Sequence, residues 1–212
     1  IACVTGFFVL LRRKITVRER VMIQEAYNMN GLSGMIAFVM RILKGTFIIE
    51  GIGAILYAIQ FVPEYGFVKG IWYAVFHSIS AFCNAGIDIL GNGSLIKYVD
   101  NPIINFTTMF LIIMGGIGFT VWYDVAHNCK IVKKKKQSPK RIFTKLTLHS
   151  KLAITMTVIL IIVGTVLVFA LEHNNPDTIG KMTLGKKLIA SAFHSVSTRT
   201  AGFATVSQAG LR

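Results

Sequence analysis

The sequence predicts an all-α membrane protein built from repeated units, each made of a helix, a re-entrant loop and a second helix. Three observations lead to this fold class. The chain is 53% hydrophobic with a mean hydropathy of +0.61, more than a soluble domain of its size needs. Long and short apolar segments alternate along it. The two short segments also resemble each other in sequence.

The positive charge of the chain follows the membrane pattern. A net charge of +14 in a soluble protein would suggest a nucleic-acid partner. Here most of it lies in two clusters, Arg12–Arg20 and Lys130–Lys151, and both flank long apolar segments. Cytoplasmic loops show this pattern under the positive-inside rule. No aromatic-basic surface is visible, so we expect the lipid bilayer, and no nucleic acid, as a partner.

The first long segment comes after an amphipathic stretch. Residues 1–11 are apolar and are expected to end a preceding helix, and residues 12–44 are expected to form a cytoplasmic or interfacial linker. The segment Gly45–Phe61 is apolar apart from Glu50, and it should stop at Pro63. We expect this segment to be a helix that crosses the membrane.

The remaining segments continue the alternation. Ile71–Phe82 would form about 18 Å of helix, which cannot cross a hydrocarbon core of about 30 Å. Ile103–Tyr123 would form about 31 Å and is expected to cross as one helix. Leu152–Leu171 is a further full-length segment, and Leu184–Ser195 is short again.

Each short segment has two interpretations, a re-entrant helix or a helix on the membrane surface. The distribution of charge favours re-entry. If both basic clusters are inside, sixteen Lys and Arg residues lie in the inside regions and five in the outside regions. A full crossing by Ile71–Phe82 would put the two clusters on opposite sides.

These segments divide the chain into five regions. Residues 1–11 would end the closing helix of a first repeat, and residues 12–44 would be the linker. Residues 45–124 would form a complete second repeat. Residues 125–151 would be a basic cytoplasmic loop, and residues 152–212 would begin a third repeat.

The internal repeat is visible residue by residue. Phe76-His77-Ser78-Ile79-Ser80 is followed by Asn84-Ala85-Gly86-Ile87, and Phe193-His194-Ser195-Val196-Ser197 is followed by Thr200-Ala201-Gly202-Phe203. The stretch from Phe to Gly is one residue longer in the first copy. Each copy follows a long apolar segment, which is typical of a duplicated membrane unit.

These residues resemble the pore loops of the bacterial Trk/Ktr potassium-uptake family, which includes the plant HKT transporters. Residues 76–88 resemble its second pore loop and residues 193–205 its third. The stretch Met114–Phe119, before Trp122, resembles the closing helix of the second repeat in the Ktr branch. The resemblance covers nearly the whole chain and implies that two of an expected four pore loops are present.

The resemblance also implies a function. Members of this family take up potassium ions across the cell membrane through a pore lined by backbone carbonyls of glycine-containing filter loops. By this resemblance we expect a multi-pass protein of the bacterial cell membrane, with potassium as the transported ion and no cofactor. The resemblance further implies a homodimer of complete subunits bound to a cytosolic nucleotide-binding regulatory subunit.

In an ion filter of this kind, we expect the backbone rather than the side chains to supply the oxygen ligands. A dehydrated potassium ion needs replacement oxygens, and a loop at membrane depth is tolerated where it lines a water-filled path. Glycine permits the backbone angles that turn carbonyls inward, and the carboxyl ends of the short helices favour a cation. The expected filter residues are Asn84, Ala85, Gly86, Ile87, Thr200, Ala201, Gly202 and Phe203.

Two charged residues are expected to support the filter. Asp88 could concentrate cations at the outer mouth or could cap its own loop, and the sequence leaves both open. Arg199 beside a cation path is costly unless it is paired, so we expect it to anchor the filter from behind.

Other polar residues have a functional and a structural interpretation. His77 and His194 occupy matching positions and could serve a proton or metal site, but packing of the short helices is the stronger interpretation. Glu50 could be functional as an intramembrane acid or could sit near the wet interface. The Lys133–Lys136 run is a solvated, lipid-facing stretch or a docking site for a regulatory subunit.

The glycines Gly115, Gly116 and Gly118 favour close helix packing over a hinge.

Two further classes of function would need features of their own. A carrier driven by an ion gradient, for another cation or solute, would need broken helices around a shared midplane site. A membrane enzyme would need a catalytic motif, and no HExxH, GxSxG or clustered carboxylates occur in the sequence. We therefore do not expect an enzyme.

Overall fold

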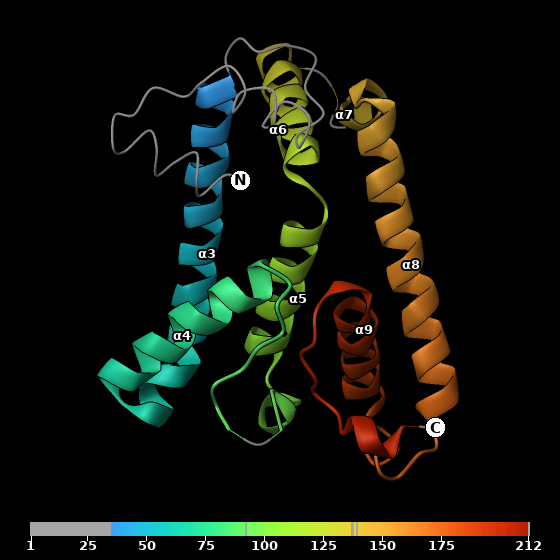
Figure 1. The fold of residues 1–212 in the computed structure, drawn as a ribbon. Helices are drawn as coiled ribbons and strands as arrows, with labels where there is room; N and C mark the ends of the chain where they lie inside the picture. The colour runs from blue at the N-terminus through green and yellow to red at the C-terminus, as the bar shows by residue number, and fades with distance from the viewer. Residues whose placement is uncertain (1–34, 92, 137, 139, 212) are drawn as a thin grey trace, which may run out of the picture. The chain divides into compact units, whose positions relative to one another are not determined.

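The computed structural model describes residues 35–91, 93–136, 138 and 140–211. The predicted helix end at residues 1–11 and most of the predicted linker lie outside this part. The chain forms two compact units, residues 1–49 and residues 50–212, and everything that follows about the candidate site concerns the second. All regular elements of the described residues are helical (Figure 1). They are α3 (Met35–Tyr65), α4 (Phe67–Phe82), η1 (Ile96–Tyr98), α5 (Pro102–Gly116), α6 (Phe119–Lys134), α7 (Lys140–Lys145), α8 (Leu148–Glu172), α9 (Leu184–Thr200) and η2 (Gln208–Gly210).

Helices α3 and α8 are long and apolar enough to cross a membrane. Helix α8 contains the whole of the predicted segment Leu152–Leu171. Helix α3 begins at Met35, inside the predicted linker, and it passes Pro63 to end at Tyr65. Pro63, which has no N–H to donate, lies in the last turn, and Gly66, at φ 80°, follows the end of the helix.

Helices α4 and α9 are short, as predicted. Their 16 and 17 residues correspond to about 24 Å and 26 Å of helix, below the thickness of a hydrocarbon core of about 30 Å. Neither is among the helices of the described part that could cross a membrane alone. Each ends in an irregular loop that begins the candidate site.

The prediction that Ile103–Tyr123 forms one continuous helix is wrong. Helices α5 and α6 are separated at Ile117–Gly118 and bent by 98° relative to each other, so a third crossing requires this pair to act as a broken span. Gly118 has φ 94°, which an L-residue with a side chain adopts only with strain. The indole of Trp122 donates to the carbonyl of Met114 at 3.0 Å and so satisfies a group near the break.

The packing interpretation holds for two of the three glycines around this break and is wrong for the third. A side chain on Gly115 would collide with the carbonyl of Phe82, and one on Gly116 would crowd Arg199. Gly118 has nothing within 4 Å of its missing side chain. Its positive φ makes it the point where the helix breaks.

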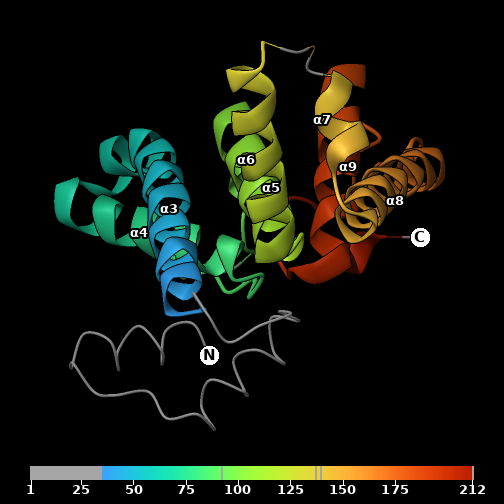
Figure 2. The same ribbon diagram turned by 90° about the horizontal axis from the view of Figure 1, so that it is seen from above.

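Helix α5 brings the two short helices together. It contacts both α4 and α9, and α9 in turn packs along α8 (Figures 1 and 2). Asn101 caps the start of α5 by accepting from Ile103 N at 3.0 Å, and Pro102 occupies the first turn. Because α5 touches both short helices, it positions the loops that follow them.

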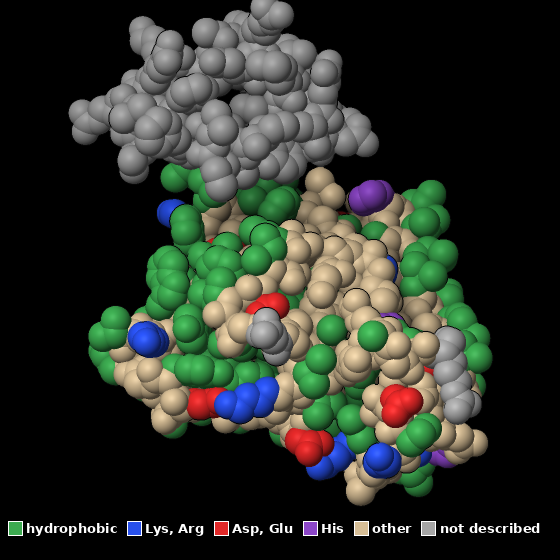
Figure 3. All heavy atoms as spheres, turned by 60° about the horizontal axis from the view of Figure 1, so that its bottom comes forward, with side chains coloured by type: hydrophobic (Ala, Val, Ile, Leu, Met, Phe, Trp, Pro, Cys, Tyr) green, Lys and Arg blue, Asp and Glu red, His purple; other side chains and the backbone are tan. Residues whose placement is uncertain are grey.

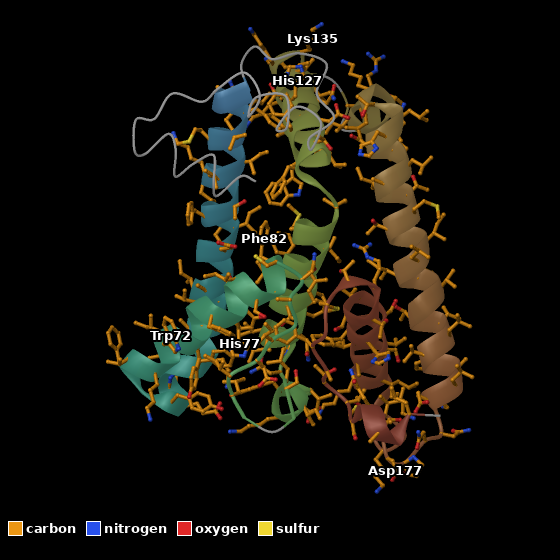
Figure 4. All side chains as sticks on the ribbon, viewed as in Figure 1. Trp72, His77, Phe82, His127, Lys135 and Asp177 are labelled. Carbon is orange, nitrogen blue, oxygen red and sulfur yellow. The ribbon has the colours of Figure 1, made fainter. Side chains whose placement is uncertain are left out.

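The predicted basic loop of residues 125–151 is largely helical, since it contains the end of α6 and all of α7. Asp124 on α6 accepts hydrogen bonds from the backbone and the hydroxyl of Thr147, both at 2.9 Å. Thr147 caps the start of α8. Lys135, beyond the end of α6, and Asp177 lie at opposite ends of the second unit (Figure 4).

Candidate functional site

The loops after α4 and α9 meet at their glycines. A side chain on Gly86 would fall on the backbone nitrogen, Cα and carbonyl carbon of Gly202. A side chain on Gly202 would lie 3.7 Å from the Cα and carbonyl oxygen of Gly86. The first loop is also tied to the second by a bond from Leu95 N to Ala204 O at 3.0 Å. Two loops far apart in sequence are therefore in backbone contact.

The two loops differ in backbone conformation. Asn84 has φ 54° and Gly86 has φ 65°, both in the left-handed region. The expectation that glycine supplies an unusual backbone angle is therefore met at Gly86. Gly202 does not have a positive φ. A side chain on Gly202 would make only ordinary contact with Gly86, so neither crowding nor its own backbone angle requires glycine there.

A serine in the last turn of each short helix holds the loop that follows. The hydroxyl of Ser80 donates to the carbonyl of Ile87 at 2.7 Å, and the hydroxyl of Ser197 donates to that of Phe203 at 2.5 Å. In both loops the acceptor is the residue directly after the glycine. Sequence reasoning missed these serines, although each is the last residue of a Phe-His-Ser-x-Ser copy.

A second serine ties each short helix to the long helix before it. Ser78 donates to the carbonyl of Glu50 on α3 at 2.6 Å, and Ser195 donates to that of Ile161 on α8 at 3.0 Å. Three residues beyond each acceptor stands a glycine, Gly53 or Gly164. A side chain on either would collide with the serine hydroxyl. The two copies thus match in their contacts as well as in their sequence.

Asn84 links the first loop to the end of α5. With its amide nitrogen toward α5, it donates to Ile112 O at 3.1 Å, and its oxygen accepts from Gly116 N at 3.2 Å. The hydroxyl of Thr200 lies 3.4 Å from the same amide. The carboxyl end of α5 therefore supports both loops.

The two predicted supporting residues, Arg199 and Asp88, have different neighbours. A side chain added to Gly116 would come within 3.1 Å of the Arg199 guanidinium, which places this cation at the carboxyl end of α5. Asp88 accepts a hydrogen bond from Leu90 N at 3.3 Å. This bond is the loop-capping contact, one of the two roles that the sequence left open for Asp88.

His77 is packed in an aromatic environment. It is fully buried on α4, and its Nδ1 bonds to the carbonyl of Tyr73 at 2.7 Å (Figure 4). Its ring lies 5.5 Å from that of Phe61 and 6.2 Å from that of Phe203 in the second loop. His194, at the matching position, is half-buried. Among the described residues, no group of three His, Cys, Asp or Glu side chains could hold a metal ion.

On the face that Figure 3 shows, charged side chains lie among apolar ones. Lys97 pairs with Glu64, and Lys186 pairs with Asp100 at 2.8 Å. The hydrogen bond to Glu64 raises the pKa of Lys97. Burial, and then the hydrogen bonds to Tyr65 and Glu64, raise the pKa of Tyr98.

Comparison with known proteins places the chain in a family. The model of the TrkH family, described as "Cation transport protein", matches residues 13–212. The chain belongs to the TrkH family. Members of this family are named as transport proteins, not as enzymes.

Several TrkH relatives are similar over most of the chain. The "Potassium/sodium uptake protein NtpJ" of Enterococcus hirae is 38% identical over 200 residues, which is 94% of this chain and 41% of the relative. The "Ktr system potassium uptake protein B" of Bacillus subtilis is 38% identical, over 96% of this chain and 43% of the relative. The protein of the same name from Vibrio alginolyticus is 36% identical over 91% and 40%. The chain thus spans about two fifths of the length of these relatives.

Proposed function

We propose that this chain contributes two neighbouring filter loops to a potassium-uptake pore of the cell membrane. The observation that carries the proposal is the backbone contact between Gly86 and Gly202. These glycines stand at equivalent places in two matching loops, and each loop follows the carboxyl end of a short apolar helix. The other loops of the pore would come from the rest of the protein.

The backbone supplies the ligands in this proposal. Carbonyl oxygens of a loop that lines a water-filled path can replace the hydration shell of a cation. The partial negative charge at the carboxyl ends of α4 and α9 adds to the attraction. Since the carbonyls of Ile87 and Phe203 accept serine hydroxyls, we leave them out of the proposed ion-facing set. The proposed ion-facing carbonyls are those of Asn84, Ala85, Gly86, Thr200, Ala201 and Gly202.

Exposed apolar residues on α4 and in its loop support a pore of more than two helix–loop–helix units. Val196 on α9, a helix that packs against α5, is 2% exposed, and Phe203 in the loop after α9 is 1% exposed. The matching residues of the first copy, Ile79 and Ile87, are 45% and 59% exposed. Trp72 on α4 is 62% exposed (Figure 4). We propose that the closing helix of another unit covers this face, as α5 covers α9.

The transported ion and the partners are also proposals. The printed names of the relatives mention potassium, and one mentions sodium as well. We propose potassium as the main ion, with no cofactor, and the lipid bilayer as the surroundings of the multi-pass protein. A homodimer of complete subunits and a cytosolic nucleotide-binding subunit complete the proposal. Neutralising Lys133–Lys136 should then weaken binding of that subunit.

The test uses the complete protein in proteoliposomes. Gly86→Ser should lower rubidium uptake at least about tenfold, since it adds a strained φ and a collision with Gly202. Gly185→Ser is the matched control, because nothing lies within 4 Å of that position. Unchanged uptake by the Gly86 variant would reject the filter. A requirement for a second solute or ion gradient would favour the coupled carrier instead.

A further inference from the structure

Ser80 and Ser197 each bond the carbonyl directly after the loop glycine, although the two loops differ in length. Ser80 bonds a carbonyl seven residues ahead, and Ser197 bonds one six residues ahead. The acceptor nevertheless follows the glycine directly in both loops. The loops differ in length, but the serine holds the same carbonyl relative to the glycine in both. We therefore take the bond to act on the backbone next to the glycine.

Both hydroxyls act in a dry setting. Ser80 is 6% exposed and Ser197 is 2% exposed. The acceptors differ in setting: the Ser197 bond to Phe203 is buried, whereas the Ser80 bond to Ile87, a residue 59% exposed, is part-buried. Loss of the Ser197 hydroxyl would leave a buried carbonyl without this partner, so that bond is worth more than the same bond on a wet surface.

The geometric consequence falls on the neighbouring carbonyl. A peptide group is planar, and each residue has only two soft dihedral angles. A tethered carbonyl at Ile87 limits how far the Gly86 carbonyl, one peptide earlier, can rotate. The same holds for Phe203 and Gly202. The serine thus restrains the glycine carbonyl without touching an ion itself.

We infer that Ser80 and Ser197 are positioning residues that set the ion preference of the filter, an inference that rests on the proposed function. Discrimination between cations depends on the distance and number of carbonyls around the ion. A filter whose carbonyls are held from behind cannot adapt equally to ions of different size. Loss of the tether lets the carbonyls follow the ion, so discrimination falls while the path stays open.

The same two helices supply a matched control. Ser78 and Ser195 lie two residues earlier, are equally small and are also hydrogen-bonded. Their acceptors are on the long helices α3 and α8, away from the loops. Alanine at these positions removes one hydroxyl from each short helix and leaves the loop tether intact.

The experiment measures uptake of rubidium, sodium and caesium by the complete protein in proteoliposomes. The compared quantities are the ratios of uptake between pairs of these ions. The ratio that lies furthest from one in the unmodified protein should move toward one in Ser80→Ala and in Ser197→Ala. The expected shift is about fivefold per serine, the effect of one net hydrogen bond. Total rubidium uptake should stay within about twofold, since the path itself is retained. Ser78→Ala and Ser195→Ala should leave the ratios unchanged.

Two further substitutions separate the hydrogen bond from packing. Ser80→Cys keeps a side chain of similar shape but donates weakly, so it should shift the ratios as alanine does. Ser80→Thr keeps the hydroxyl and should preserve them. If the alanine variants do not reach the membrane, the Cys and Thr pair decides the question with the same readout.

Two outcomes would overturn the inference. Unchanged ion ratios in Ser80→Ala, Ser197→Ala and Ser80→Cys would show that the tether does not set ion preference. An equal shift in Ser78→Ala would show a general loosening of the helix. Either result leaves the filter itself standing if Gly86→Ser still blocks rubidium uptake. If Gly86→Ser has no effect either, the proposed function fails as well.

Discussion

A side chain on Gly86 would occupy the space of the Gly202 backbone, whereas a side chain on Gly202 would make only ordinary contact with Gly86, at 3.7 Å. Gly86 also has φ 65°, and Gly202 has no positive φ. The contact between the two loops is therefore asymmetric. Of these two equivalent glycines, only Gly86 is required to be glycine by its backbone angle and its surroundings.

This asymmetry predicts unequal tolerance to alanine. Gly86→Ala should lower rubidium uptake at least about tenfold, because strain and collision act together. Gly202→Ala should lower it by less than about threefold, because an ordinary contact distance needs little rearrangement. Uptake by proteoliposomes at matched protein content is the measurement. Equal losses in the two variants would contradict the asymmetry.

Gly53 and Gly164 are predicted to set the approach of each short helix to its long helix. Alanine at either position would displace the hydroxyl of Ser78 or Ser195. Overpacking of this kind costs about 1–3 kcal/mol, so the unfolding temperature in detergent should fall. Gly51→Ala is the control on the same helix as Gly53, since nothing lies within 4 Å of it. A fall in Gly51→Ala as large as in Gly53→Ala would contradict the prediction.

Asp124 is predicted to hold the start of α8 against α6. Asp124→Ala removes the acceptor of both Thr147 bonds, and trypsin should then cut faster at the basic residues around α7. Asp124→Asn keeps one acceptor oxygen, so its cleavage rate should lie between those of Asp124→Ala and the unmodified protein. The measurement is the rate of cleavage in detergent at low trypsin. Equal rates for the alanine variant and the unmodified protein would show that the bond does not hold this end.

Gly118 is predicted to define the break between α5 and α6. Gly118→Ala leaves the site uncrowded but places a side chain at φ 94°, which should cost about 1 kcal/mol of stability. The unfolding temperature of this variant should fall below that of the control Gly185→Ala. If the break were a matter of packing rather than backbone angle, the two variants would have the same unfolding temperature.

The sequence alone was sufficient for the elements that depend on composition and length. Helix α8 follows from its uninterrupted apolar run, because backbone groups in a membrane must be satisfied within the segment. The shortness of α4 and α9, and their likeness to each other, were also readable from residue order. These features are local, so no knowledge of neighbours was needed.

The break after α5 shows where local reasoning ends. Gly115, Gly116 and Gly118 are compatible with a packed helix and with a broken one. The outcome depends on the indole of Trp122 meeting the carbonyl of Met114 and on Phe82 packing against Gly115. Those partners come from other turns and other helices, so residue order does not specify them.

Some features of the candidate site follow from residue order, and others depend on tertiary packing. The sequence determined that Gly86 and Gly202 stand at matching places after two matching helices, because a repeat is a property of residue order. Only the tertiary structure decided that the two glycines touch, and that Ser80 and Ser197 hold the next carbonyl. The physical reason is that α5 packs against both short helices, and this shared contact brings together loops that are far apart along the chain.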